Sequence, residues 1–150
     1  MYSVIGVAQE TTFDTMLYNT LEKTVPFISI HQLKNNYSTY TILDTREMKE
    51  YEISHLKNSI HVGFDNFNSN KAFPKNKPIV VYCSIGYRSE KIGELLIQKG
   101  YTVFNLYGGI FNWINTNNTV VNTSNLITKN IHPYNKKWSK WLTTGIKTYD

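Results

Sequence analysis

Short apolar runs rich in β-branched and aromatic residues alternate along the chain with segments whose apolar positions recur every three or four residues. Apolar runs of this kind predict strands, and the helical spacing predicts amphipathic helices. The predicted strands are 27–30, 40–43, 59–62, 78–82 and 102–105, and the predicted helices are 13–22, 45–53, 89–99 and 108–113, with one further turn around Gln32 and Leu33. The alternation predicts an α/β domain with a parallel sheet.

Local signals refine these elements. Asp44 followed by Glu47 resembles a helix cap, and in the helix that follows, Met48 and Tyr51 are expected to face inward. Gly100 is placed to end the helix before it in a left-handed conformation. The segment 78–82 is apolar throughout, as expected of a strand buried on both faces.

Three further segments carry weaker patterns. Residues 63–77, rich in Asn, Lys and Phe, are expected to form a connection with one helical turn, and 115–130, rich in Asn and Thr, to form a long loop. Trp138, Trp141 and Leu142 predict a last helical segment that docks back on the domain. We interpret these tryptophans, and Trp113, as core anchors.

Composition narrows the function classes. A chain of 150 residues with 41% hydrophobic residues fits one domain with a real core. The net charge is +5, but the longest basic run is Lys136-Lys137, so no nucleic-acid partner is expected. No stretch approaches the ~18 apolar residues that span a membrane. A single cysteine excludes an intrachain disulfide.

The N-terminus leaves two locations open. Residues 4–9 read like the tail of a secretory hydrophobic region, but they lack a positive flank and the apolar run is too short for a signal. We therefore expect a cytoplasmic protein with a loose start. The alternative is export to the periplasm, if residues 1–8 are the stump of a longer signal.

The lone cysteine, Cys83, directly follows the most apolar strand and precedes a helix. A turn at that point can aim backbone N–H groups at one spot, and the helix N-terminus adds partial positive charge there. Both favour a nucleophilic thiolate. Gly86 allows the turn unusual backbone angles, and Arg88 and Ser89 add donors at its rim. The alternative is a cysteine that is merely a small buried hydrophobe.

A second polar residue is expected beside this turn. Ligands of parallel sheets bind at the carboxyl ends of the strands, and Asp44 ends one predicted strand as Cys83 follows another. His31, His61 and His132 have no cysteine or carboxylate partner at ligand spacing, so no metal site is expected.

Three stretches resemble the rhodanese family between about residues 27 and 115. Residues 42–51, followed by His55-Leu56, resemble its Asp-x-Arg-Glu segment. Residues 79–89 resemble its active-site strand and loop, and Leu106 to Trp113 resemble its Leu-x-Gly-Gly-x-x-x-Trp signature. There are departures at Ser54 and at 57–59, which lie on an expected surface turn. The order and spacing of the three stretches make the resemblance specific.

The resemblance implies a rhodanese-like α/β fold with a five-stranded parallel sheet and helices on both faces. It implies a domain over 25–116, an N-terminal extension with a helix over 1–24, and a C-terminal extension over 117–150 that packs on the domain. The implied activity is sulfur transfer through a persulfide on Cys83, with no cofactor. The implied active-site loop is Ser84, Ile85, Gly86, Tyr87, Arg88 and Ser89, braced by Asp44 and Arg46. His55 is implied to be a packing or hydrogen-bonding residue.

The implied partners are a small sulfur donor, thiosulfate or a persulfide, and a thiol or cyanide-like acceptor, with a protein acceptor as a further option. Some thiosulfate-using relatives carry a basic residue where Glu50 stands, which argues against thiosulfate as the natural donor. The alternative is a catalytically idle rhodanese-like module for protein interaction or redox sensing, but such modules commonly lose the cysteine. A phosphatase ranks third, because the resemblance implies that phosphatases use a seven-residue loop, whereas Cys83 to Arg88 is six.

Overall fold

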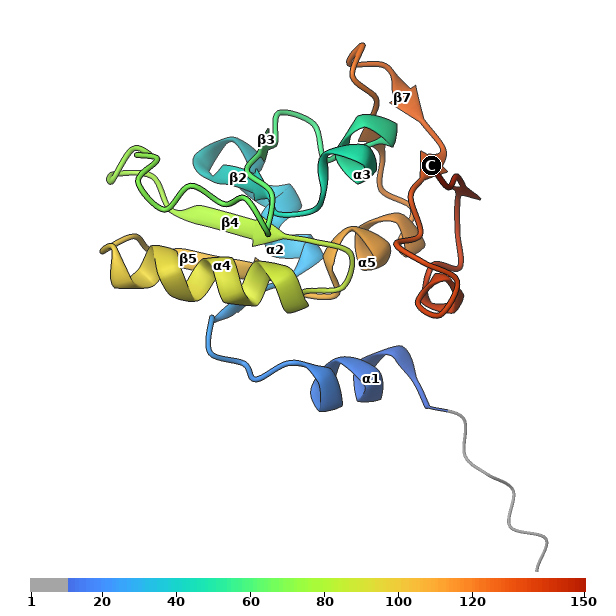
Figure 1. Cartoon of the computed structure of the whole chain (residues 1–150), viewed down its shortest axis with the longest axis horizontal. Helices are drawn as coiled ribbons and strands as arrows, with labels where there is room; N and C mark the ends of the chain where they lie inside the picture. Colours follow the sequence, from blue (N-terminus) through green and yellow to red (C-terminus); the bar gives the residue numbers. More distant parts are fainter. Residues whose placement is uncertain (1–10) are drawn as a thin grey trace, which may run out of the picture.

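The computed structural model describes residues 11–150, so the hypothesis of a signal stump at residues 1–8 lies outside the described residues. A five-stranded parallel sheet forms the centre of the molecule, with strand order β1-β5-β4-β2-β3 (Figure 1). The strands are β1 (Phe27–Ile28), β2 (Thr41–Asp44), β3 (Ile60–His61), β4 (Ile79–Tyr82) and β5 (Val103–Leu106). The predicted fold class is confirmed.

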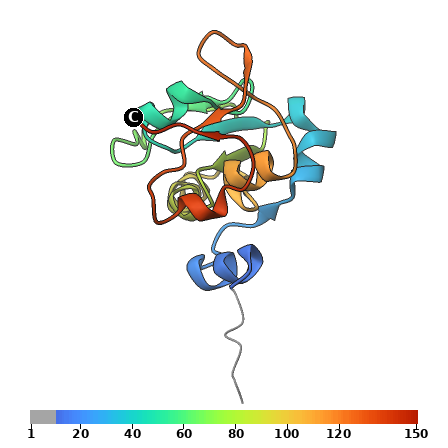
Figure 2. The ribbon, with the colours of Figure 1, turned by 90° about the vertical axis from the view of Figure 1, so that its right-hand side faces the viewer.

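Helices cover both faces of this sheet, as Figures 1 and 2 show. Along β4 the side chains alternate, because successive residues of a strand point to opposite faces. The helices are α1 (Phe13–Thr20), α2 (Ile30–Asn35), α3 (Met48–Ile53), α4 (Tyr87–Gln98) and α5 (Gly109–Asn115), with 3₁₀ turns η1 (Tyr37–Thr39) and η2 (Ser139–Trp141). Val80 and Tyr82 pack in the core under α2 and α5, and Ile79 and Val81 pack under α4.

The start of α3 differs from the prediction. Its N-cap is Glu47 rather than Asp44, and the Glu50 side chain accepts a hydrogen bond from the Glu47 N–H at 2.8 Å. Met48, expected to face inward, is 50% exposed, and Glu50 is buried instead. The inward prediction for Met48 was therefore wrong, because the inner face of α3 presents Glu50, which pairs with Arg88.

Smaller differences also concern where elements begin and end. Helix α4 begins at Tyr87, two residues earlier than predicted, so the last residues of the active-site loop belong to its first turn. Residues 63–77 contain no helical turn. Gly100 has a φ of 87°, in the left-handed region predicted for it. Residues 27–28 alone form the first strand, because Ser29 caps α2.

The C-terminal segment is more ordered than a long loop. Strands β6 (Val120–Val121) and β7 (Ile127–Thr128) form an antiparallel pair, and β8 (Asn130–Ile131) pairs with β9 (Ile146–Lys147). Ile131 and Leu142 are fully buried in the main core, with Trp138 and Trp141 packed against it. Among the residues described, no helix has the length and apolar character needed to cross a membrane.

Candidate active site

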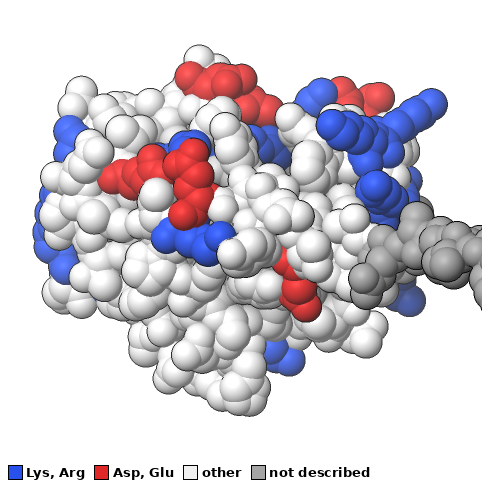
Figure 3. Space-filling model, turned by 90° about the horizontal axis from the view of Figure 1, so that it is seen from below, with Lys and Arg blue, Asp and Glu red and all other residues white. Residues whose placement is uncertain are grey.

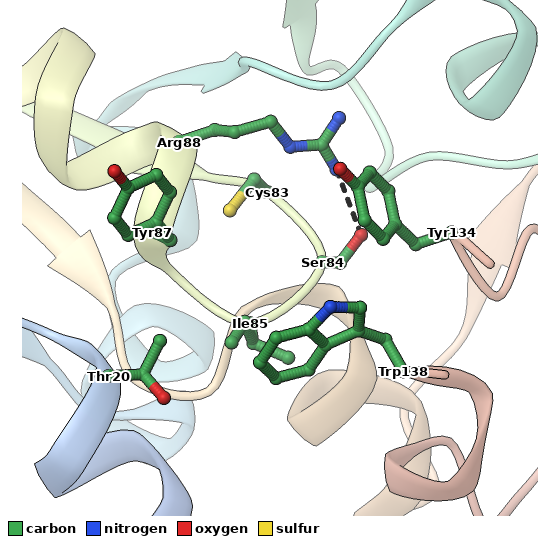
Figure 4. Close-up of a pocket in the computed structure, with 8 residues that line it drawn as sticks. All are labelled: Thr20, Cys83, Ser84, Ile85, Tyr87, Arg88, Tyr134 and Trp138. Atoms are coloured by element: carbon green, nitrogen blue, oxygen red, sulfur yellow. Dashed lines mark hydrogen bonds between the residues drawn. The ribbon is translucent and has the colours of Figure 1, made fainter. Parts of the chain in front are cut away.

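Cys83 lies between β4 and α4, at the carboxyl edge of the sheet (Figure 4). The Gly86 backbone N–H donates a hydrogen bond to Cys83 Sγ over 3.1 Å. Gly86 reaches this position with a φ of 129°, which an L side chain rarely adopts. Gly86 is the N-cap of the twelve-residue helix α4, so its amide belongs to the helix N-terminus, a position that favours the binding of an anionic group.

Helix α5 holds the loop from behind. The N–H groups of Ile110 and Phe111 donate to the carbonyl oxygens of Cys83 and Ser84 at 2.9 and 3.0 Å. Gly109 lies so close that a Cβ there would stand 2.5 Å from Ser84 O and 2.6 Å from Cys83 O. Gly109 therefore allows the backbone of α5 to contact the loop that carries the cysteine, whereas Gly108 faces Asn112 and Phe13.

Asn105, which the sequence analysis did not single out, braces the loop from β5. Its Nδ2 donates to Gly86 O at 3.0 Å, and its Oδ1 accepts from Ser89 Oγ at 2.7 Å. The side chain is fully buried. A signal was present in the sequence, because Asn105 ends the predicted strand 102–105 and so lies at the carboxyl end of a strand, where ligands of parallel sheets bind. Ser89, expected to be a donor at the rim, is directed mainly to Asn105.

Arg88 does not point to the sulfur but to Glu50. Its two terminal nitrogens lie 2.6 and 2.9 Å from the two Glu50 carboxylate oxygens, and its Nη2 also donates to Ser84 Oγ at 3.0 Å. Glu50 is only 1% exposed. Burial by itself raises the pKa of the Glu50 carboxyl, but the hydrogen bond and charge of Arg88, with the charge of Arg46, lower the pKa below its ordinary value.

Replacing this carboxylate should therefore change how stability depends on pH. A carboxyl whose pKa is lowered by folding stabilises the protein above its unfolded pKa of about 4.3, and this contribution disappears as pH falls through the folded pKa. We expect Glu50→Gln to lower the free energy of unfolding by about 3 kcal/mol at neutral pH, because Arg88 loses a buried partner. The difference from wild type should shrink below about pH 4. Urea unfolding at several pH values measures both effects; a difference that stays constant with pH would contradict this role for the pair.

Asp44 and Arg46 form a second buried ion pair at the same edge. Arg46 Nη2 lies 2.7 Å from Asp44 Oδ2, and the same nitrogen donates to Ser54 O at 2.7 Å. Tyr82 Oη donates to Asp44 Oδ2 at 2.5 Å, which ties the pair to β4. The structure thus places both residues beneath the site, in contact with its supporting elements, while Cys83 lies outside their hydrogen bonds.

His55, on the same side of the sheet, stacks on Tyr51 with ring centroids 3.8 Å apart.

The family model of the rhodanese-like domain matches residues 29–116, more than half of the chain. The chain belongs to the rhodanese-like family. A rhodanese-related protein from Thermoplasma volcanium is 32% identical with a TM-score of 0.61, and the match covers 64% of this chain and 97% of that one. A protein from Bacillus halodurans, 24% identical with a TM-score of 0.59 over 75% of this chain and 88% of its own, shares the fold.

Curated relatives also match this rhodanese-like chain. Proteins named tRNA uridine(34) hydroxylase from Streptococcus thermophilus and Streptococcus gordonii are each 32% identical over 112 residues, covering 68% of this chain and 34% of theirs. The chain therefore spans about a third of the length of these relatives.

A cavity of about 250 Å³ opens above Cys83 of the rhodanese-like loop. Figure 4 shows the lining side chains arranged around the loop, with the cysteine sulfur near its centre. Tyr87, Tyr134 and Trp138 supply aromatic rings; we call these three the aromatic wall. Trp138, interpreted from the sequence only as a core anchor, packs against the core and also lines the cavity.

One cluster of possible metal ligands occurs among the described residues, formed by Glu22, Glu90 and Glu94. It does not line the cavity above Cys83. Glu90 is buried, and its carboxylate already accepts the N–H groups of Glu22 and Lys23 at 2.9 and 2.8 Å. These bonds assign the buried carboxylate a structural task, fixing the chain that leaves α1.

Proposed function

We propose that this rhodanese-like chain is a sulfurtransferase that carries a sulfane sulfur on Cys83. The observation that carries the proposal is the position of Cys83 Sγ, which lines a cavity and accepts the Gly86 amide at 3.1 Å at the N-terminus of α4. A thiol that lines an open cavity at the N-terminus of a helix is well placed for covalent catalysis. Ser84 to Ser89 form the substrate-binding loop, and Asp44 and Arg46 support it.

The proposed reaction is a double displacement. Cys83 thiolate bonds to the outer sulfur of the donor, the bond between that sulfur and the donor breaks, and the donor fragment leaves with the electron pair. An acceptor thiolate or cyanide then bonds to the outer sulfur of the Cys83 persulfide, and Cys83 leaves as the thiolate. Each step exchanges one bond for another, so no cofactor or external oxidant is required.

Two features argue against the competing functions, which are an idle interaction module and a protein that binds nucleic acid. An idle interaction module has no need of the Cys83 thiol, whereas here the thiol is retained and contacted by the loop. For a nucleic-acid partner, as the name of the longer streptococcal relatives would suggest, a continuous basic surface is expected. On the face in Figure 3, Lys and Arg side chains form separate groups, with acidic and uncharged side chains between them. We therefore propose small-molecule donors and thiol or cyanide-like acceptors, with a protein thiol as an option.

One experiment distinguishes sulfur transfer from phosphate chemistry. With a sulfane donor and cyanide, the wild-type protein is expected to form thiocyanate. With an aryl phosphate it is expected to release no more phenol than a trace, because Arg88, which would bind the oxyanion, is paired with Glu50. Strong aryl-phosphatase activity without thiocyanate formation would overturn the proposed function.

A further inference from the structure

The cavity above Cys83 is completed by segments that lie outside the region matched by the family model. Thr20 comes from the end of α1, and Tyr134 and Trp138 come from the C-terminal segment. Together with Ile85 and Tyr87 of the loop they surround the space into which a donor must enter to reach the sulfur (Figure 4). The chemistry of these side chains therefore bears on which donor fits.

The positive charge in this cavity is already paired with a carboxylate. Of the described residues that line it, Arg88 alone is charged. Both of its terminal nitrogens are bonded to Glu50, and the centre of its guanidinium lies 4.7 Å from the centroid of the Tyr134 ring, which covers one face of the group. A dianion such as thiosulfate would therefore enter without a free cation to offset its loss of hydration.

Tyr134 is held in place rather than left loose on the surface. Its N–H donates to Nδ1 of the buried His132 at 3.0 Å, and it adopts a φ of 71°, which is uncommon for a tyrosine. Because Nδ1 accepts this bond, Nε2 carries the proton and donates to the Asp150 carboxylate at 2.7 Å. The backbone N–H of Trp138 donates to Asn135 Oδ1 at 3.0 Å, and its ring packs against the main core. The backbone positions of Tyr134 and Trp138 are thus fixed before a donor binds.

Resting on the proposed sulfurtransferase function, we propose that Cys83 takes its sulfur from a small organic donor whose leaving group carries an apolar, and best of all aromatic, body. The body of the donor lies between Tyr87, Tyr134 and Trp138, with its outer sulfur at Cys83. A volume of about 250 Å³ is below the range of drug-sized ligand sites, which favours a body of roughly one ring. Aromatic rings gain extra stabilisation when they pack against other rings.

Two thiosulfonate anions of equal charge test this preference, because they differ only in the apolar body. In each, Cys83 thiolate bonds to the outer sulfur, the bond from that sulfur to the sulfonyl sulfur breaks, and the sulfinate leaves with the electron pair. The probes are benzenethiosulfonate and methanethiosulfonate, with thiosulfate as a third donor. Rates are divided by those of each donor with a free thiol, which removes differences in intrinsic reactivity.

The wild type is expected to show kcat/KM about 10-fold higher for benzenethiosulfonate than for methanethiosulfonate, and thiosulfate is expected to be the poorest of the three. Trp138→Ala and Tyr134→Ala should each reduce the preference for the aromatic donor several-fold. Tyr18→Ala is the matched control, because Tyr18 is a 70% exposed aromatic residue that does not line this cavity. It should leave the preference unchanged.

The outcomes separate the two proposals. Equal use of the two thiosulfonates, thiosulfate as the best donor, or an unchanged preference in Tyr134→Ala would overturn the donor class and leave sulfur transfer standing. Formation of no Cys83 persulfide from any of the three donors would overturn both. Because Trp138 packs on the core, circular dichroism is used to show whether Trp138→Ala is folded. The 42% exposed Tyr134 carries the test by itself if Trp138→Ala fails to fold.

Discussion

Replacing Cys83 with serine is expected to reduce sulfur transfer to background. Serine keeps the approximate volume of the side chain and an acceptor for the Gly86 N–H, so the loop should hold its shape. A hydroxyl at neutral pH is a far weaker nucleophile than a thiolate, and it cannot store a sulfur atom as a persulfide. The chain contains no second cysteine that could take over the role. Thiocyanate formation from a sulfane donor and cyanide measures the loss.

The control for this variant is a comparison of its fold with that of the wild type. The far-ultraviolet circular dichroism spectrum and the midpoint of thermal unfolding are expected to match the wild type, and Cys83→Ala should behave as the serine variant does. Transfer that persists in both variants would rule out a covalent intermediate on Cys83. A protein that has lost its fold would instead show that the cysteine is needed for packing.

Gly109→Ala is expected to have the second largest effect, although this residue does not line the cavity. Gly109 has a φ of 61°, and a methyl group added to it would stand 2.5 Å from Ser84 O, so an alanine must push the active-site loop away. The shift would lengthen the bonds from Ile110 and Phe111 to the loop carbonyls. A displacement of ~1 Å at a catalytic group can lower the rate by ~100-fold, and we expect a loss of that order in kcat/KM.

Gly100→Ala is the matched control for this substitution. Gly100 also has a positive φ, of 87°, but the nearest atom to its Cβ position is the end of the flexible Lys75 side chain at 3.5 Å. Both variants should lose about 1–2 kcal/mol of stability from the backbone conformation. Gly109→Ala alone should lose sulfur transfer. Equal activity of the two variants would contradict the view that Gly109 sets the position of the Cys83 loop.

The alternation of strands and helices and the position of the nucleophile could be predicted from the sequence, because both depend on local patterns. Residues 79–82 are apolar throughout and are followed at once by a polar turn, so strand, turn and helix could be placed to within two residues. The buried face of α3 could not be predicted in the same way, because it carries Glu50, whose partner Arg88 lies on another helix.

The partners of the active-site loop were harder to predict, since they come from distant parts of the chain. Glu50 reaches Arg88 across 38 residues, and nothing in the local sequence of α3 distinguishes a buried glutamate from an exposed one. Tyr134 and Trp138 lie outside the residues that the family model matches. There, an aromatic residue in the sequence predicts packing but does not identify the surface against which it packs. Only the tertiary arrangement shows that Trp138 serves the core and the cavity together.

The most direct test of sulfur transfer through Cys83 is the mass of the peptide that contains it. The protein is incubated with a sulfane donor, the excess donor is removed, and the peptide is analysed without reducing agent. We predict an added mass of one sulfur atom on Cys83, which disappears when cyanide is added as an equal amount of thiocyanate forms. A Cys83 peptide that stays unmodified with every donor, in a folded protein, would contradict the proposed persulfide mechanism.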